Sequence, residues 1–299
     1  MVAAYGMLTS AGSARATDCG NGVEMQVRAP ETPEAVQGTL LLVEVRSEKP
    51  LTQIAGKWNE REVPFWKEEV NAKSADVADV RRALLGVDLE KPPGKYSFTL
   101  EGQLADGERV SCYESWQVEE GHFATENLTV KKQFVEPNPE QLARAEAEAK
   151  RLREIYDHVT PERLWDGKFR MPLDGEFKGT NFGKRRVLNG KAGSPHGGVD
   201  FPAPTGTPVH AAQSGRVVLA EELYFAGNTV VVDHGLGIYT FYCHFSEIDA
   251  KVGDAVRAGT VLGKVGATGR VTGPHLHWGL SVERARVNAL DIVKLLGSK

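Results

Sequence analysis

GPHLHWG, residues 273–279, places two of the chain's eight histidines on either side of a single leucine. Alternate residues of a β-strand point to the same face, so His275 and His277 would line one cleft, about 6.6 Å apart along the strand. Without reorientation of the side chains, that separation is too large for two equivalent ligands of one metal ion. It allows one imidazole to bind a metal while the other reaches a water molecule. Two surface histidines on an ordinary strand are the alternative interpretation of this motif alone.

A second motif, PHGGVDF at residues 195–201, carries a histidine and an aspartate four residues apart. Two consecutive glycines disfavour a helix here and allow a bend that brings an imidazole nitrogen and a carboxylate oxygen together. A catalytic zinc site needs three protein ligands of nitrogen and oxygen type and one open position. His196, Asp200 and one histidine of the first motif would complete such a site. A solvent-exposed turn is the competing interpretation of this pair alone.

The third motif is YTFYCHFSE, residues 239–247. Strand alternation predicts that His244 shares a face with Thr240 and Tyr242, opposite Phe241 and Cys243. The same alternation argues against a Cys243–His244 catalytic dyad, because neighbouring residues face opposite ways. A buried, hydrogen-bonded core histidine is the alternative.

Several other catalytic patterns are absent from the sequence. It has no HExxH, no GxSxG, no GxGxxG and no phosphate-binding loop. The metalloprotease pattern with a glutamate base and the serine-hydrolase elbow are therefore excluded as motifs. If the site hydrolyses a substrate, we expect a histidine to accept the proton.

The composition is that of an ordinary folded protein. The chain has 299 residues, of which 41% are apolar and 25% charged, with a net charge of −4. This length favours two compact domains over one. The mild acidity gives no basic footprint for nucleic acid, and we expect none as a partner. No apolar run approaches the ~20 residues of a membrane span, and the oligomeric state stays open.

Residues 1–20 are predicted to be a weak or truncated signal-like segment. They contain a short apolar patch and then Ala14-Arg15-Ala16, which has the small-x-small form of a signal-peptidase site. A basic leading region is missing, so an unstructured tail is the alternative. The three cysteines leave two possibilities open, a single disulfide between Cys19 and Cys112 or free thiols.

The rest of the chain divides into three segments. Residues 21–120 contain short, turn-separated apolar runs, which favour an immunoglobulin-like β-sandwich as an accessory domain. Residues 121–164 are predicted as a linker with a helix at about 138–158, where Asn138, Pro139 and Gln141 fit an N-cap and capping box. Residues 165–299 are rich in glycine and strands and form the second domain. The apolar face of the expected helix consists of Leu142, Ala145, Ala149, Leu152 and Tyr156.

These motifs lie in three blocks of sequence, which contain NFGKRRVLNGKAGSPHGGVDF, GNTVVVDHGLGIYTFYCHFS and VGATGRVTGPHLHWG. The blocks resemble those of the lysostaphin-type (LytM-like) zinc metallopeptidases, in the same order, over roughly residues 165–285. The resemblance implies a mainly antiparallel β-fold with a long groove. It also implies cleavage of peptide bonds in bacterial peptidoglycan.

The resemblance further implies a role for each motif residue. His196, Asp200 and His277 would bind one Zn²⁺ per chain, and His244 and His275 would be the catalytic histidines. The zinc would activate a water molecule, and which histidine takes its proton stays open. The departures from the family pattern leave the ligand positions intact: Phe245 stands where leucine is frequent, His210 where tyrosine is usual, and Cys243 precedes His244. His234 is assigned no chemistry.

The resemblance implies a hydrolase that is exported to the periplasm or cell wall, with peptidoglycan as its partner. A non-catalytic peptidoglycan-binding or hydrolase-activating protein on the same fold is the alternative, disfavoured because all three ligand positions are filled. A biotinyl or lipoyl carrier, to which KVGDAVRAGTVLGKVG (residues 251–266) bears some likeness, would need a lysine that the hairpin HGLG lacks. The front domain could be a spacer, a wall-binding module or an inhibitory cover, and the scissile bond stays open.

Overall fold

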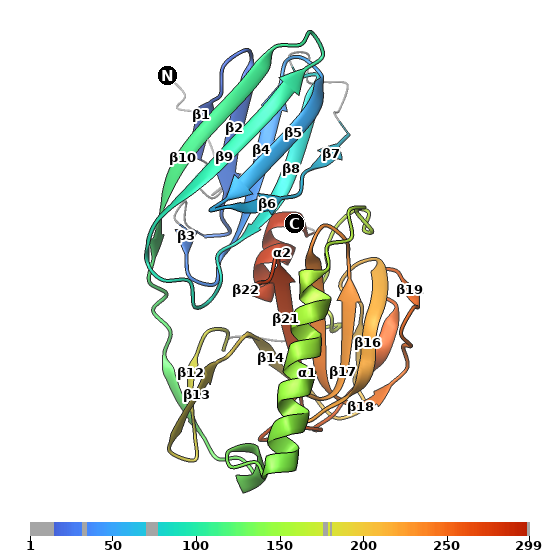
Figure 1. Cartoon of the computed structure of the whole chain (residues 1–299). Helices are drawn as coiled ribbons and strands as arrows, with labels where there is room; N and C mark the ends of the chain where they lie inside the picture. The colour runs from blue at the N-terminus through green and yellow to red at the C-terminus, as the bar shows by residue number, and fades with distance from the viewer. Residues whose placement is uncertain (1–14, 32–34, 70–76, 176–178, 180, 298–299) are drawn as a thin grey trace, which may run out of the picture.

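The computed structural model describes residues 15–31, 35–69, 77–175, 179 and 181–297 (Figure 1). Most of the predicted signal-like segment, residues 1–14, lies outside the described residues. The described residues form four β-sheets and two α-helices, so the prediction of a mainly β chain is confirmed. Neither of these helices is both long and apolar enough to cross a membrane.

Two five-stranded sheets form the N-terminal half. The first has the order β1 (Arg15–Asp18), β2 (Val23–Arg28), β4 (Leu40–Ser47), β8 (Asp79–Gly86) and β7 (Trp66–Glu68). The second has the order β3 (Ala35–Val36), β10 (Arg109–Glu119), β9 (Gly94–Leu104), β5 (Leu51–Trp58) and β6 (Arg61–Val63). Side chains of both sheets share one apolar cluster, so the two sheets pack face to face.

Strand β10 shows why this half folds as two layers. Every second residue is buried, and the buried positions include Val110, Trp116 and Val118. This period of two is the mark of a strand with one face on a core. Cys112, also on the buried face, is joined to Cys19 in a disulfide with its Cα atoms 5.1 Å apart. The structure thus selects the disulfide from the two possibilities left open by the sequence.

Strand β4 is covered on both faces, which fits its nearly continuous apolar sequence LLLVEV. Leu41 and Val43 point into the cluster between the two sheets. Leu40 and Leu42 point the other way and belong to the core of the C-terminal half. Trp66 and Leu84 extend the same outward face. The two halves of the chain are therefore joined by a shared hydrophobic core.

Polar contacts surround this junction. The Arg286 guanidinium donates to the carboxylate of Asp88 at 2.8 Å. The Leu40 amide donates to the carboxylate of Asp291 at 3.3 Å. Burial raises the pKa of Asp291 to about 6. In Figure 1 the two sheets lie at the opposite end of the molecule from β12 and β13.

The C-terminal half is built on a nine-stranded sheet. Its main path is β14 (Gly198–Pro202), β21 (His275–Val282), β18 (Ile238–Ile248), β17 (Gly227–Asp233), β16 (Gly215–Leu223) and β19 (Ala255–Val256). Three further strands branch from it: β15 (Pro208–His210), β20 (Val261–Val265) and β22 (Ala285–Val287). Helix α2 (Ala289–Leu296) follows β22 and packs Ile292 into the shared core.

The connecting segment contributes to the C-terminal half. Strand β11 (Thr125–Leu128) pairs in parallel with β12 (Arg185–Leu188), which pairs with β13 (Lys191–Pro195). A short 3₁₀ turn, η1 (Lys132–Phe134), leads to helix α1 (Pro139–Asp157). Asn138 caps α1 and Gln141 completes a capping box, which satisfies backbone groups at the helix start.

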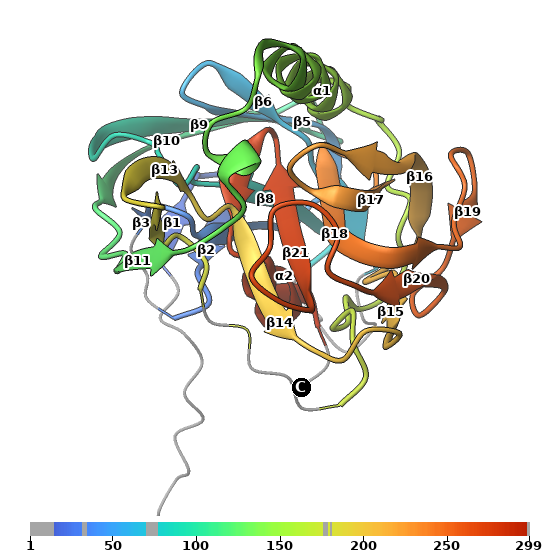
Figure 2. The same ribbon diagram turned by 90° about the horizontal axis from the view of Figure 1, so that it is seen from below.

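Helix α1 packs on the large sheet through its last turns. Leu152 and Tyr156 contact an apolar cluster that contains Val231 and Tyr239. Leu142 lies on the first turn and is 46% exposed, so this member of the expected apolar face does not pack. In Figure 2, α1 lies to one side of β21, and β14 and β21 run between the small sheet and strands β17 and β18.

Candidate metal centre and active-site groove

Two neighbouring strands present the first pair of candidate ligands. In the antiparallel pair β14–β21, Asp200 lies directly opposite His277. Directly opposed residues point to the same face of a sheet. The Asp200 Oδ1 atom consequently lies 2.8 Å from the His277 Nδ1 atom.

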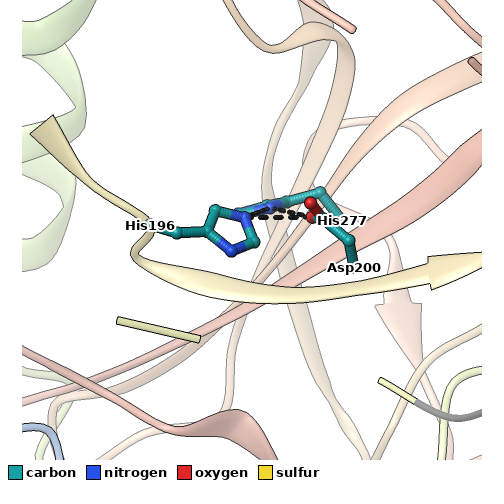
Figure 3. A group of neighbouring side chains, drawn as sticks. All are labelled: His196, Asp200 and His277. Carbon is teal, nitrogen blue, oxygen red and sulfur yellow. Dashed lines mark hydrogen bonds and ion pairs between the residues drawn. The ribbon is translucent and has the colours of Figure 1, made fainter. Parts of the chain in front are cut away.

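His196, just before β14, supplies the third candidate ligand. Its Nε2 atom lies 2.8 Å from Nδ1 of His277 and 3.0 Å from Oδ1 of Asp200 (Figure 3). Its other ring nitrogen, Nδ1, faces the carbonyl oxygen of Asn181 at 2.9 Å. A carbonyl only accepts, so Nδ1 carries the proton and Nε2 is left with a lone pair. The three residues named from the sequence as ligands therefore converge on one point.

This convergence fits a divalent metal ion. The ligand atoms of His196, Asp200 and His277 all lie within 4.8 Å of one another. Two imidazole nitrogens and one carboxylate oxygen are a donor set that zinc takes in catalytic sites. Without a cation, three electron-rich atoms would face one another with too few protons between them. The donor chemistry of these side chains therefore fits zinc.

The second glycine of the PHGGVDF motif makes room for His277. A Cβ atom at Gly198 would lie 2.6 Å from Nε2 of His277 and 2.7 Å from the Trp278 carbonyl oxygen. Real Cβ atoms do not approach so closely, so a larger residue would displace the imidazole. At Gly197 the nearest atom would be 3.7 Å away, an ordinary contact.

The other carboxylate oxygen of Asp200 is held by residues to which the sequence analysis gave no role. Asn181 Nδ2 and Arg186 Nη2 each donate to Oδ2 at 2.8 Å. Burial alone would raise the pKa of Asp200, but the adjacent imidazoles of His196 and His277 outweigh it and hold the pKa far below its usual range. Asp200 is thus an oriented anion. The NFGKRR segment lies in the first sequence block, but its spacing does not reveal this contact.

His275 and His244 form a second pair beside the three ligands. Their ring centroids are 4.8 Å apart, and the His275 Nε2 atom lies 3.7 Å from Oδ1 of Asp200. Nδ1 of His275 faces the Gly273 carbonyl at 2.9 Å, and Nδ1 of His244 faces the Thr268 carbonyl at 2.8 Å. Each histidine therefore donates from Nδ1 and keeps a lone pair on Nε2.

The predicted orientation of His244 is wrong. Its backbone φ of 66° lies in the left-handed region, and the pairing of β18 with β20 shifts register just beyond it. This irregularity breaks the alternation along β18. Tyr242 stays in the core, where its hydroxyl accepts from the Ala212 amide, while the His244 ring lies 6.0 Å from that of His277. His244 therefore joins the face that carries the candidate ligands.

Burial keeps two of these imidazoles neutral. Desolvation, followed by repulsion from His277 and His275, lowers the pKa of His244 to about 3. Desolvation also lowers the pKa of His277 to about 4, against an opposing hydrogen bond with Asp200. At neutral pH both rings therefore keep the lone pair that metal binding or proton acceptance requires.

A groove of about 320 Å³ opens beside these residues. His244, His275 and Asp200 line it, together with Arg186 and Arg270. One wall comes from the connecting segment and includes Glu126, Leu128 and Val130 of β11 and the residues after it. Among the described residues, none of those that line the groove belongs to the N-terminal sheets between residues 15 and 119.

The remaining histidines of the C-terminal motifs lie apart from the groove lining. His234 is fully buried and hydrogen-bonds the Ser214 carbonyl and the Thr240 hydroxyl. Burial lowers its pKa to about 4, as expected for a neutral core histidine. His210 lies 3.1 Å from the carboxylate of Asp174. Cys243 is a free, buried thiol.

The fold and the group of His196, Asp200 and His277 fit a β-protein with a metal centre, and comparisons with known proteins identify its family. The profile described as Peptidase family M23 matches residues 194–289, which contain all five candidate site residues. A crystal structure described as a putative peptidase M23 from Pseudomonas aeruginosa is 31% identical, covers 89% of this chain and 96% of its own, and has a TM-score of 0.64.

Two curated relatives match less than half of the chain. The peptidoglycan DD-endopeptidase ShyA of Vibrio cholerae is 44% identical over 123 residues, which is 40% of this chain and 29% of ShyA. The DD-carboxypeptidase/endopeptidase Mpg of Neisseria meningitidis is 40% identical over 97 residues, 32% of this chain and 22% of Mpg. The chain thus spans less than a third of these relatives.

The likeness to the Pseudomonas aeruginosa structure extends over 96% of that chain at 31% identity. This chain therefore belongs to peptidase family M23.

Proposed function

We propose that this chain is an exported, zinc-dependent endopeptidase that cleaves peptide bonds of bacterial peptidoglycan. One observation carries the proposal: His196, Asp200 and His277 converge on a single point at the edge of a groove that also contains His244 and His275. The name of ShyA, a peptidoglycan DD-endopeptidase, supports the choice of substrate, and the name of Mpg, a DD-carboxypeptidase/endopeptidase, supports cleavage of peptide bonds. Whether stem peptides or cross-links are cut is part of what the experiment below resolves.

In this proposal His196, through Nε2, His277, through Nδ1, and Asp200, through Oδ1, would hold one zinc ion per chain. When bound, zinc supplies a Lewis acid and lowers the pKa of a water molecule at the open position. Asn181 and Arg186 keep the Asp200 carboxylate from rotating, because they occupy its other oxygen. Partners of this kind orient metal ligands and support metal affinity.

We assign acceptance of the water's proton to His275. Its Nε2 atom carries a lone pair and lies 3.7 Å from Oδ1 of Asp200, within reach of a water molecule beside that oxygen, as a general base must be. His244 also presents an Nε2 lone pair, because Thr268 fixes its Nδ1 proton. In that tautomer it accepts a hydrogen bond and orients the water or a substrate N–H. Stabilising an oxyanion from this nitrogen would first require its protonation.

The disulfide supports export, because structural disulfides persist mainly outside the reducing cytoplasm. We also propose that the two N-terminal sheets form an immunoglobulin-like accessory module that supports the peptidase half without covering its groove. This view is supported by the groove lining, because the described residues that line the groove all come from residue 126 onward.

The test compares His277→Ala with His275→Ala in the full chain. We expect His277→Ala to lose zinc, measured by elemental analysis, and to lose release of soluble fragments from peptidoglycan. We expect His275→Ala to keep near-stoichiometric zinc and lose turnover by about 100-fold or more, the usual size of a general-base contribution. Mass spectrometry of fragments from defined muropeptides identifies the bond that is cut.

Two outcomes would contradict the proposal. Equal zinc content in wild type and His277→Ala would remove the ligand assignment. Binding of peptidoglycan by the zinc-loaded wild type without release of fragments would favour a non-catalytic, wall-binding role on the same fold.

A further inference from the structure

Arg270 occupies a fixed position beside the candidate catalytic residues. Its backbone N–H donates to the Phe225 carbonyl at 2.8 Å. The preceding Gly269 packs so closely on the turn before β17 that a Cβ there would lie 2.4 Å from the Gly227 nitrogen. Thr268 lies two residues before Arg270, and its carbonyl oxygen accepts a hydrogen bond from Nδ1 of His244. The loop that carries Arg270 is therefore the same loop that orients His244.

The side chain of Arg270 stacks on an aromatic platform. Its guanidinium carbon lies 4.6 Å from the centroid of the Phe225 ring. Phe225 is held in turn by Tyr224, with ring centroids 4.9 Å apart, and by Phe134 of η1 at 6.4 Å. Stacking on a ring orients a guanidinium and leaves its N–H groups free to bind a further partner.

Arg270 differs from Arg186, which also lines the groove, and from the nearby Lys184 in having no carboxylate partner. Arg186 is paired with Asp200 at 2.8 Å, and Lys184 with Glu126 at 2.8 Å. Within the described part of the chain, no carboxylate lies within ion-pair distance of Arg270, although it lines the same groove. Burial, and then repulsion from Arg186, lowers the pKa of Arg270. A partly buried, unpaired guanidinium costs free energy in the free protein and gains most from an anionic ligand.

We propose that Arg270 is a specificity-determining residue that binds a carboxylate of the substrate peptide and thereby places the scissile bond at the histidines. This inference rests on the proposed peptidase function and deepens it, since it names the substrate feature that the groove selects. A planar guanidinium matches a carboxylate with two parallel hydrogen bonds. A carboxamide in the same place would offer one acceptor and no charge. The groove should therefore discriminate between an acid and its amide.

The experiment uses the zinc-loaded full chain and a set of synthetic cross-linked stem peptides. One peptide carries all of its carboxylates free, and each of the others has one carboxylate replaced by a carboxamide. We expect wild type to lose about 10- to 100-fold in kcat/KM on one amide, the range for a hydrogen-bonded charge pair. Arg270→Gln should lose a similar factor on the acid and should no longer distinguish the acid from that amide.

Arg270→Lys and Arg216→Gln are the matched controls. The lysine variant keeps the charge without the fork and should fall between wild type and Arg270→Gln. Arg216 bonds a backbone carbonyl of residue 253 away from the groove, so Arg216→Gln should keep wild-type discrimination. If wild type cleaves the acid and every amide equally well, or if Arg270→Gln keeps the discrimination, the proposal is overturned.

A binding arm separates this proposal from the proposed function. Calorimetry measures the affinity of the same acid and amide peptides for two proteins, His275→Ala and the double variant His275→Ala/Arg270→Gln. Suppose that wild type hydrolyses none of the peptides, that His275→Ala binds the acid more tightly than the amide, and that the double variant does not. The peptidase function then fails and the carboxylate site stands. Equal affinities for acid and amide in both proteins would refute the carboxylate site whatever the activity.

Discussion

The residues of the PHGGVDF motif contribute to the site in different ways. His196 and Asp200 bring donor atoms to one point, whereas Gly198 contributes by having no side chain. At the first glycine of the pair, Gly197, a Cβ atom would meet only the Arg286 side chain, at an ordinary contact distance of 3.7 Å. Two adjacent residues of the same type thus provide a matched test of how tightly the candidate metal centre is packed.

We expect Gly198→Ala to lower zinc affinity by at least about 10-fold, because the new methyl group displaces the His277 imidazole. The crowding should also reduce the free energy of unfolding by about 1–3 kcal/mol. Gly197→Ala is the control and should change both quantities little. Competition with a chromogenic chelator gives the affinity, and urea unfolding gives the stability. Equal zinc affinity in the two variants would mean that His277 does not depend on the space at Gly198.

Strands and their irregularities decide which residues meet. The opposition of Asp200 and His277 follows from the register of β14 and β21, while His244 reaches the same face only through an irregular backbone at its own position. Strand β11 adds a wall to the groove from a segment that the sequence analysis treated as a linker. Elements far apart in sequence therefore build one site.

The disulfide between Cys19, just after β1, and Cys112 of β10 links the two N-terminal sheets and spans 93 residues. Loop-closure entropy predicts that it stabilises this half by about 4–5 kcal/mol. We expect a phosphine reductant to lower the unfolding midpoint of wild type in urea. The Cys19→Ala/Cys112→Ala variant should start at the lower midpoint and should not respond to the reductant. A midpoint of wild type that is the same with and without reductant would contradict the prediction.

At the scale of the whole molecule, the C-terminal half shares its apolar core with the segments that precede it. The last turns of α1 cover Val231 and Tyr239 on the large sheet. Leu40 and Leu42 of β4 complete the core that contains Val282 and Ile292. Removing residues 1–164 would expose both apolar surfaces and remove β11 from the groove.

We therefore expect the fragment 165–299 to unfold at a lower temperature than the full chain, to aggregate more readily, and to turn over peptidoglycan more slowly. Exposed apolar area of this kind is a recognised cause of association. Differential scanning fluorimetry and fragment release measure the two effects. An unfolding temperature and a rate equal to those of the full chain would contradict the expectation. A faster fragment would instead support an inhibitory cover by the front half.

The sequence by itself determined the parts of this protein that depend on local chemistry. The period of two in β10 and the capping residues around Asn138 act over a few neighbouring positions, and the structure has both. Imidazole and carboxylate groups can serve as zinc donors wherever they occur, so His196, Asp200 and the histidine pair stood out as candidates. Their motifs also sufficed to indicate peptidase family M23, which the comparisons confirm.

The tertiary structure alone decided how these groups are arranged. Three contacts link positions whose separation in the sequence follows no rule. Asn181 and Arg186 donate to Asp200, and the His244 ring lies beside that of His277. Arg270 stacks on Phe225. The Cys19–Cys112 pairing and the docking of β4 on the C-terminal core are of the same kind. Such contacts depend on strand register, bulges and the packing of distant surfaces. These are set by the free energy of the whole fold, which no short stretch of sequence contains.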